Sequence, residues 1–327
     1  MTEILQAPFP YFGGKSRIAA KVWQLLGQPR HYIEPFFGSG AVLLARPDYD
    51  PTKHIESIDD KDGFVANVWR SLQASPDEVA KYCDWPVNHA DLCARRRALL
   101  KNEDRLLENL VADEKWCDPI MAGYWIWAAS CWIGSGLTCL NARPHLGDTG
   151  TGINALGKIP RLGNTGEGIN AIGKIPQLSD DTMNVQAPYN TNLYQWFRRL
   201  SERLRYVRVV CGDWTRVCGG NWQDRMGDVG MYFDPPYGVT DRATDIYHEE
   251  SITVAKDVET WCLARGDRPS YRIVISGYDT EYKSLVENGW GVFKWSAGAG
   301  YSTSDNNNRH RERLFISPHC VKEGVLL

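Results

Sequence analysis

The alternation of apolar and polar positions predicts an α/β chain. Apolar residues at helical spacing predict a helix over 16–27, and the segment 31–35, which runs directly into a glycine-containing stretch, predicts a short strand. After a glycine-containing segment, helical character resumes at 41–45, and a second strand over 54–58 ends at Asp59. This order of strand, glycine loop, helix, strand and acidic residue is typical of the start of a doubly wound α/β nucleotide site.

The pattern changes near residue 78, where long helical stretches begin, including 95–111 and the Trp-rich segment 121–133. The strand pattern resumes later, in the segments 206–211, 230–234, 271–276, 290–294 and 313–316. We therefore expect an α/β domain formed by 1–77 and 201–327, split by a mostly helical insertion over 78–200.

The insertion contains a tandem repeat, in which 146–160 recurs as 162–176. Each copy has four glycines and one lysine, so a loop or a small hairpin is expected rather than a helix. Two interpretations remain open: a duplicated surface loop without a role, and a basic loop that closes on nucleic acid.

Composition narrows the class of protein. The chain has 327 residues, 43% hydrophobic and 24% charged, which is ordinary for a globular protein. No apolar run approaches the ~20 residues of a membrane-spanning helix, and no basic segment followed by an apolar one indicates a signal peptide, so no membrane association and a cytoplasmic location are expected. Nine cysteines without a Cys-x-x-Cys pair, and seven histidines without a His-x-x-x-His pair, favour reduced, mostly buried thiols and no structural metal.

The net charge of −3 argues against a large surface that binds polyanions regardless of sequence. Between 195 and 216, however, six arginines face two acidic residues, a local charge of +4, and Arg309, Arg311 and Arg313 form a second basic cluster. Taken alone, these clusters are more typical of solvated helix faces than of a binding site.

The segment 231–237 carries the most specific chemistry. An apolar strand ends at Asp234, and the following Pro235 and Pro236 can continue neither a strand nor a helix. The segment therefore offers a carboxylate, the carbonyl of Pro235 and the aromatic face of Tyr237 at the carboxyl end of a strand, where α/β sheets bind ligands. These groups suit a planar ring with an exocyclic amine. The alternative is a strand-ending turn with an exposed tyrosine.

Three motifs, in this order, resemble those of Dam-like adenine-specific DNA methyltransferases: Pro10-Tyr-Phe-Gly-Gly-Lys15, Phe36-x-Gly38-x-Gly40 and Asp234-Pro-Pro-Tyr237. The resemblance covers about the first 75 residues and the part after about 205. It implies a Rossmann-like doubly wound methyltransferase sheet with a helical target-recognition insertion, and S-adenosyl-L-methionine as cofactor. The cofactor-binding residues implied are Tyr11, Lys15, Glu34, Pro35, Phe36, Gly38, Ser39, Gly40, Asp59, Asp213, Trp214 and Asp234.

Within that set, the resemblance implies that the glycine loop lies beneath the methionine part of the cofactor. Asp59 would accept from the ribose hydroxyls, with the adjacent Asp60 as a competitor, and Asp213 would accept from the adenine amine beside Trp214. Tyr11 and Lys15 would lie near cofactor and target. Gly13-Gly14-Lys15 lacks the spacing of a phosphate-binding loop, so nucleotide hydrolysis is not expected.

The reaction implied is direct transfer of a methyl group to the 6-amino group of an adenine flipped out of duplex DNA. The catalytic residues implied are Asp234, Pro235, Pro236 and Tyr237, with no metal. Methylation of a cytosine ring carbon is not expected, since the chain has no Pro-Cys dipeptide. Candidate contacts to double-stranded DNA are Arg95, Asn141, Arg143, Lys158 and Lys174.

Three points stay open in the sequence. Arg95 to Arg97 are more typical of a solvated helix face than of a DNA contact, and Trp125, Trp127 and Trp132 are more typical of a core than of base stacking. An RNA base is an alternative substrate, because the same groups serve any exocyclic amine. A binding protein of the same fold that has lost activity is the third alternative.

Overall fold

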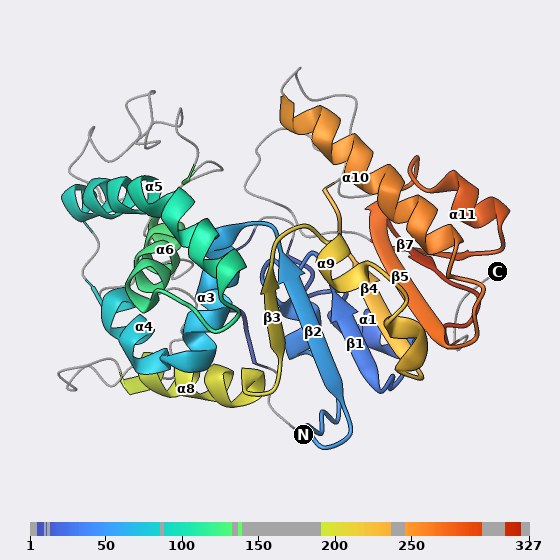
Figure 1. Cartoon of the computed structure of the whole chain (residues 1–327), viewed down its shortest axis with the longest axis horizontal. Coiled ribbons are helices and arrows are strands. Elements are labelled where there is room, and N and C mark those ends of the chain that lie inside the picture. Colours follow the sequence, from blue (N-terminus) through green and yellow to red (C-terminus); the bar gives the residue numbers. More distant parts are fainter. Residues whose placement is uncertain are drawn as a thin grey trace. The chain divides into compact units, whose positions relative to one another are not determined.

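The computed structural model describes residues 5–9, 11, 14–85, 88–132, 137–138, 191–236, 246–295 and 311–321 (Figure 1). The chain forms two compact units. The first, here called the helical unit, comprises Met1–Gly14, Asp60–Arg205 and Val209–Gly212. The second, the sheet unit, comprises Lys15–Asp59, Tyr206–Arg208 and Asp213–Leu327.

The described strands form one seven-stranded sheet in the order β3-β2-β1-β4-β5-β7-β6 (Figure 1). Their bounds are β1 (His31–Glu34), β2 (Ile55–Asp60), β3 (Arg208–Cys211), β4 (Val229–Phe233), β5 (Tyr271–Tyr278), β6 (Gly291–Lys294) and β7 (Glu312–Ile316). β1 pairs in parallel with β2 and β4, and β4 pairs in parallel with β5, whereas β7 is antiparallel to both β5 and β6. The α/β class predicted from the sequence is confirmed, with a mixed, mostly parallel sheet.

The central strands of the sheet are buried on both faces. β4 is buried along its whole length, and so is β1, as expected for parallel strands. The described helices of the sheet unit are α1 (Ala19–Leu26), α2 (Ala41–Leu44), α9 (Thr215–Cys218), α10 (Ile246–Leu263) and α11 (Lys283–Glu287), with a 3₁₀ turn over Gln223–Arg225. α10 has no counterpart among the predicted elements.

Helix α1 begins later than its apolar pattern predicts. Ser16, a residue type that often caps helices, stands at the predicted start, but the N-cap position is Ile18. The carbonyl of Lys15 accepts from the N–H groups of Ile18 and Ala19. The helix ends as predicted at Gly27, whose φ of 68° is a conformation that L side chains rarely adopt. Lys15 therefore lies in the hydrogen-bonded turn that directly precedes α1.

The helical unit contains α3 (Gly63–Ala74), α4 (Pro76–Cys83), α5 (His89–Ala112), α6 (Pro119–Cys131) and α8 (Thr191–Leu204). Side-chain caps start three of them, since Asp62, Asn88 and Asp118 each accept from backbone N–H groups of the first turn. α6 is buried on most of its surface. Trp125 and Trp127 lie in the core of the helical unit, as predicted, whereas Trp132, which follows the helix, is only half-buried.

The compact units differ from the expected domain bounds, because the helical unit includes Met1–Gly14 and its main segment starts at Asp60, whereas the predicted insertion starts at residue 78. The division into a catalytic domain and a target-recognition insertion stays a prediction, and the tandem repeat over 146–176 lies outside the described residues. In the described part of the chain, every helix is too short or too polar to cross a membrane.

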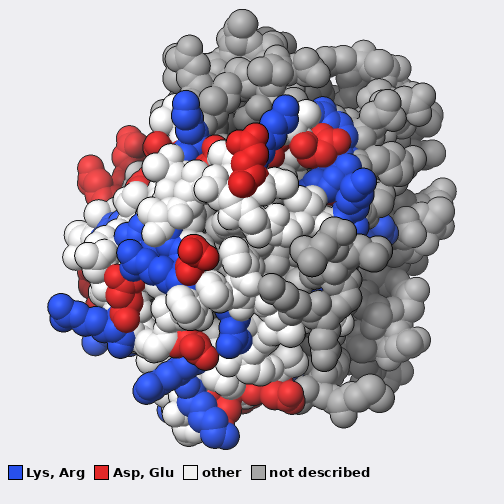
Figure 2. Space-filling model, turned by 90° about the vertical axis from the view of Figure 1, so that its right-hand side faces the viewer, with Lys and Arg blue, Asp and Glu red and all other residues white. Residues whose placement is uncertain are grey.

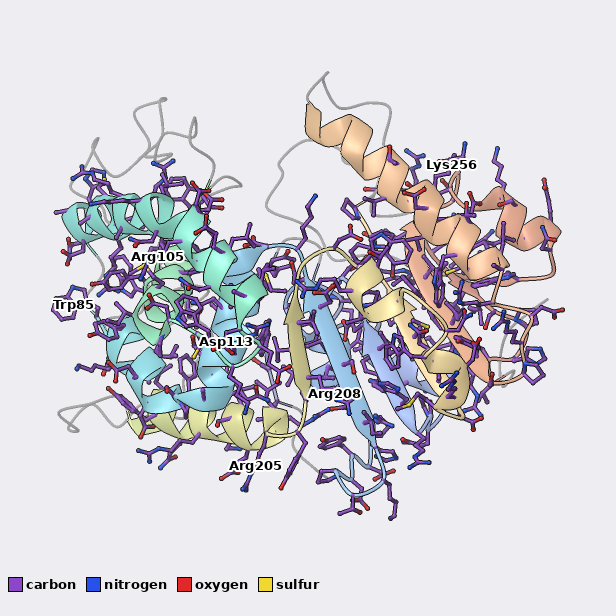
Figure 3. The ribbon with its side chains drawn as sticks, viewed as in Figure 1. Trp85, Arg105, Asp113, Arg205, Arg208 and Lys256 are labelled. Atoms are coloured by element: carbon purple, nitrogen blue, oxygen red, sulfur yellow. The ribbon has the colours of Figure 1, made fainter. Side chains whose placement is uncertain are left out.

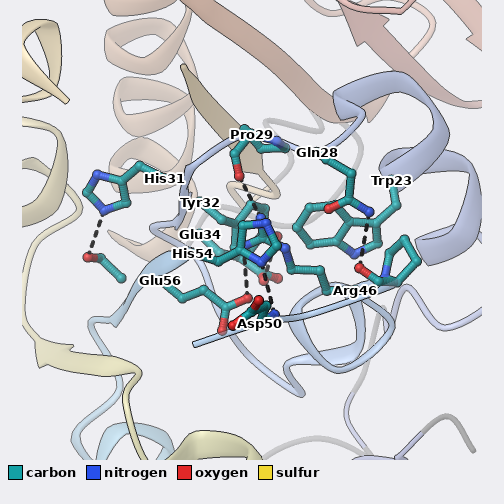
Figure 4. Close-up of polar contacts among 12 residues, drawn as sticks. Trp23, Gln28, Pro29, His31, Tyr32, Glu34, Arg46, Asp50, His54 and Glu56 are labelled. Carbon is teal, nitrogen blue, oxygen red and sulfur yellow. Dashed lines mark hydrogen bonds and ion pairs between the residues drawn. The ribbon is translucent and has the colours of Figure 1, made fainter. Parts of the chain in front are cut away.

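A buried ion pair joins the segment after α2 to strand β2 (Figure 4). Arg46 Nη1 lies 3.1 Å from Glu56 Oε1, and both side chains are fully buried. Arg46 also donates from Nη2 to the carbonyl of Pro29 at 2.6 Å, and its guanidinium lies over the ring of Trp23. The contacts hold the chain that leaves the glycine loop against the sheet.

Candidate active site

The carboxyl ends of β1 and β4 lie next to each other in the sheet unit. The two strands pair in register His31 with Val229 and Ile33 with Met231. From β1 the sheet order runs to β2 and β3 on one side, and to β4 and β5 on the other. Such a reversal of strand order is a topological switch point, at whose carboxyl side α/β sheets bind ligands.

The segment that follows β1 is the glycine loop of the sequence motif. Gly38 and Gly40 have φ values of 50° and 65°, in the left-handed region that favours glycine. The N–H of Gly40 donates to the carbonyl of Phe37 at 2.9 Å, and the N–H of Phe37 donates to the carbonyl of Asp59 at 3.0 Å. Both glycines therefore shape a tight turn that is tied to strand β2. Pro35 and Ser39 are buried in it, and α2 follows as a single turn.

Strand β2 carries the two candidate acids at its end. The strand continues through Asp60, one residue beyond the predicted end. Asp59 is fully buried and its charge acts on the thiol of Cys218, while Asp60 is half-buried and its Oδ1 accepts from the N–H of Asp62. Asp60 thus has a local structural role, and the sequence preference for Asp59 as the ribose acceptor stays a prediction.

Aromatic rings line the ends of β1, β3 and β4. Phe36 stacks on Trp214, with 6.4 Å between ring centroids and 28° between planes, and lies 6.4 Å from Phe233. Trp214 is 7% exposed and also contacts Trp261 edge-on. Phe36 is half-buried whereas Trp214 and Phe233 are buried, so among these three rings it is the one that a ligand can reach.

Asp213 has a local partner of its own. Its Oδ1 accepts from the N–H and from the hydroxyl of Thr215, at 3.0 and 2.5 Å. The side chain is exposed and lies two residues before the first residue of α9. The resemblance implies that Asp213 accepts from the adenine amine of the cofactor. To do so, Asp213 would use its other carboxylate oxygen, or the turn would have to rearrange.

Asp234 follows β4 directly and is held by an ion pair. Its Oδ2 lies 2.8 Å from Nζ of Lys15, with side-chain exposures of 21% for the aspartate and 6% for the lysine. Pro235 is buried and Pro236 is exposed. Tyr237 lies outside the described residues. The carboxylate therefore stands at the sheet end with a fixed cationic partner.

Two further acids act on the same region. Glu34 is buried and accepts from the hydroxyl of Tyr32 at 2.8 Å (Figure 4). Burial raises the pKa of Glu34 well above its usual value, and the charge of Asp234 raises it further. Burial also raises the pKa of Glu312 on β7, where Lys15 and Asp234 act in opposite directions. Sequence reasoning missed Glu312, because it belongs to no motif and is brought near by the antiparallel pairing of β7 with β5.

Two predicted residues lie in the helical unit instead. Tyr11 is 41% exposed, with its ring edge-on to that of Phe9 at 6.1 Å. Arg95 is 7% exposed, so the expected solvated helix face is wrong at this position. Its Nη1 donates to the carbonyl of Tyr82 at 2.7 Å, and its guanidinium lies 4.3 Å from the ring of Trp127. Arg95 has little surface to offer DNA. Asn141, Arg143, Lys158 and Lys174 lie outside the described residues.

The basic segment 195–216 behaves mostly as a solvated surface. Arg198 on α8 forms a two-bond contact with Asp77, and both side chains are more than half exposed. Figure 3 shows Arg205 and Arg208, both exposed, and Trp85 pointing outward from the helical unit. On the described part of the face in Figure 2, basic and acidic side chains are interspersed.

The described cysteines are all free thiols, and six of the eight are buried, as predicted. Burial raises the pKa of Cys131 to about 12, so this thiol stays protonated. Among the described residues, no group of three or more His, Cys, Asp or Glu side chains is arranged to hold a metal ion.

Comparison with known protein families finds no family model that matches the chain, and comparison with curated proteins finds no match either. A function is therefore inferred from the motifs and the geometry of the sheet end.

Proposed function

We propose that the protein is a DNA methyltransferase that transfers a methyl group from S-adenosyl-L-methionine to the 6-amino group of adenine. The observation that carries the proposal is the adjacency of two motif segments, the glycine loop after β1 and Asp234-Pro235-Pro236 after β4, at one switch point of the sheet. The same adjacency supports a Rossmann-like doubly wound methyltransferase sheet as the finer description of the fold.

The residues at the sheet end fit the proposed cofactor. Gly38 and Gly40 adopt left-handed conformations that favour glycine. Because neither residue has a side chain, a ligand can approach the backbone of the loop closely. Asp59 supplies a buried carboxylate suited to ribose hydroxyls, and Phe36 supplies an aromatic face beside Trp214. When bound, S-adenosyl-L-methionine supplies an electrophilic methyl group.

Asp234 and its neighbours would hold the nucleophile. The carboxylate accepts one hydrogen bond from the adenine amine and the carbonyl of Pro235 accepts a second, which directs the nitrogen lone pair away from the ring. The prolines donate no hydrogen bonds and restrict the preceding backbone, so the corner is rigid. Rigid placement lowers the entropy that must be lost on reaching the transition state. The resemblance assigns the stacking platform for the flipped base to Tyr237.

Double-stranded DNA is the substrate that the resemblance implies, and the helical unit with the tandem repeat is the candidate reader. Because four of the five predicted DNA contacts lie outside the described residues and Arg95 is buried, support for DNA comes from the motifs alone.

Methyl transfer from radiolabelled S-adenosyl-L-methionine to duplex DNA of mixed sequence tests the proposal. The wild-type protein should incorporate label that co-migrates with N6-methyladenine after digestion. Asp234→Asn should lose at least about a hundredfold in rate, within the range for groups that act on the reacting atoms, and should still bind the cofactor. Asp267→Asn, an exposed carboxylate elsewhere in the sheet unit, is the matched control and should keep full activity.

The same assay separates the alternatives. Label in RNA but not in DNA would identify an RNA base methyltransferase. Cofactor binding without transfer to any nucleic acid would identify a silent relative, and Asp234→Asn with wild-type activity would refute the assigned chemistry.

A further inference from the structure

Lys15 is built into the sheet end rather than displayed on the surface. It stands in the turn before α1, where its carbonyl accepts from the N–H groups of Ile18 and Ala19, and its side chain is 6% exposed. A buried ammonium costs several kcal/mol of desolvation unless it is paired. The 2.8 Å contact with Asp234 pairs the ammonium and helps to offset this cost.

Four acidic and phenolic groups lie within electrostatic reach of Asp234. Its charge acts on Glu34 of β1, on Tyr232 of its own strand, on Tyr282 before α11 and on Glu312 of β7. Each of these interactions disfavours the negative form of the partner group. Lys15 brings a positive charge to this group: it pairs with Asp234, and its charge also acts on Glu312.

A carboxylate near other carboxylates tends to take up a proton, whereas a cation within ~4 Å favours its charged form. Protonation would matter for the proposed reaction, because a protonated carboxyl turns one of its oxygens into a donor and no longer accepts fully from an amine. The Lys15 ammonium therefore favours the form of Asp234 that accepts from an amine.

We propose that Lys15 is the positioning residue of this site, whose ammonium fixes the Asp234 carboxylate and keeps it ionised beside Glu34 and Glu312. The inference rests on the proposed function for its catalytic meaning, but the ion pair itself can be tested without it. It differs from the role that the resemblance implies for Lys15, which is proximity to the cofactor and the target.

The direct test is a pH titration of the protein labelled with ¹³C at the aspartate carboxyl carbon and followed by NMR. The Asp234 signal is assigned by its absence from Asp234→Asn. In Lys15→Met the midpoint of this signal should rise by about one pH unit or more relative to wild type, and Lys15→Arg should restore most of the wild-type midpoint. Adding Glu312→Gln to Lys15→Met should lower the midpoint again, since one neighbouring acid is removed.

Lys21→Met is the matched control, because Lys21 lies on α1 and contacts Gln24 and the ring of Phe293 instead. It should leave the Asp234 midpoint unchanged. A Lys15→Met midpoint that stays within about 0.3 pH units of wild type would overturn the proposal, and circular dichroism identifies a variant that has not folded. If Lys15→Met has not folded, two other variants decide. The Asp234 midpoint should stay unchanged in Lys15→Arg and should be lower in Glu312→Gln than in wild type.

Activity adds a second readout. With saturating cofactor, Lys15→Met should move the acidic limb of the pH–rate profile to higher pH while the cofactor Kd stays within about twofold. An unchanged acidic limb together with a strongly raised Kd would assign Lys15 to the cofactor instead. If the wild-type protein transfers no methyl group, the proposed function fails, and the NMR titration still decides the role of Lys15.

Discussion

Replacing Glu56 with glutamine removes the negative partner of a buried ion pair while it keeps the shape of the side chain. Glu56 Oε1 and Arg46 Nη1 are 3.1 Å apart, and neither side chain reaches solvent. In Glu56→Gln the guanidinium keeps the carbonyl of Pro29 and the ring of Trp23. The variant therefore isolates the effect of the missing charge.

The magnitude follows from the distance and the burial. At 3.1 Å and an effective dielectric constant of about 20, two unit charges attract by about 5 kcal/mol. Part of this attraction offsets the desolvation of both ions, which the fold has already incurred. In the variant Arg46 stays buried without its counter-ion, so we expect the free energy of unfolding to fall by about 3–5 kcal/mol.

Urea denaturation followed by tryptophan fluorescence measures this loss. Asp77→Asn is the control, because it breaks the Arg198 pair, whose 2.7 Å distance is shorter but whose side chains are 58% and 53% exposed. Its cost should be below about 1 kcal/mol. The double variant Arg46→Met/Glu56→Leu should lose less than Glu56→Gln, since it leaves no buried charge. A Glu56→Gln loss no larger than that of Asp77→Asn would refute the reasoning.

Three further predictions follow from single residues. Burial, with the positive charges of nearby arginines, lowers the pKa of His31 from 6.5 to about 4. As the pH falls below 6.5, the unfolded chain therefore binds a proton before the folded protein does, and the free energy of unfolding should fall by about 2 kcal/mol between pH 7 and pH 5. Denaturation curves of His31→Gln should not show this loss. Gly38→Val should weaken S-adenosyl-L-methionine binding at least tenfold by calorimetry, because the φ of Gly38 is 50°. The control Gly220→Ala, at a φ of 71° but with open space around it, should cost only about 1 kcal/mol of stability. Equal cofactor affinities of Gly38→Val and the wild-type protein would show that the glycine loop is not part of the site. Arg95→Met should lower the free energy of unfolding, measured in urea, by about 2 kcal/mol, because the variant loses a hydrogen bond and the contacts with aromatic rings. If the variant instead kept its stability and lost much of its affinity for DNA, Arg95 would be a DNA contact after all.

Part of the fold was predictable because buried strand segments, such as that of β4, read as short, mostly apolar runs. β1, β4 and β7 lie within a residue or two of the predicted segments. The start of α1 was not predictable. Ser16 is a residue type that often caps helices, but the turn at Lys15, whose carbonyl accepts from Ile18 and Ala19, precedes the helix instead. The pairing order was also outside reach, since antiparallel β7 enters the sheet between β5 and β6 through contacts distant in sequence.

For the site, motif spacing located the two segments that meet at the switch point, Phe36 to Gly40 and Asp234 to Pro236. Individual roles were harder to assign. Whether an aspartate caps a turn, as Asp213 does, or remains for a ligand depends on the local backbone. Arg95 lies next to two exposed or half-buried arginines in sequence, yet burial among rings contributed by α6 sets it apart.

The central claim is that the corner at Asp234 and the glycine loop together methylate adenine in DNA. The most direct measurement is mass spectrometry of nucleosides from the DNA of a host without adenine methylation of its own, expressing either the wild-type protein or Asp234→Asn at equal levels. We expect N6-methyladenine in the first DNA and background levels in the second. Unmodified adenine in both, with folded protein and bound S-adenosyl-L-methionine demonstrated, would contradict the account.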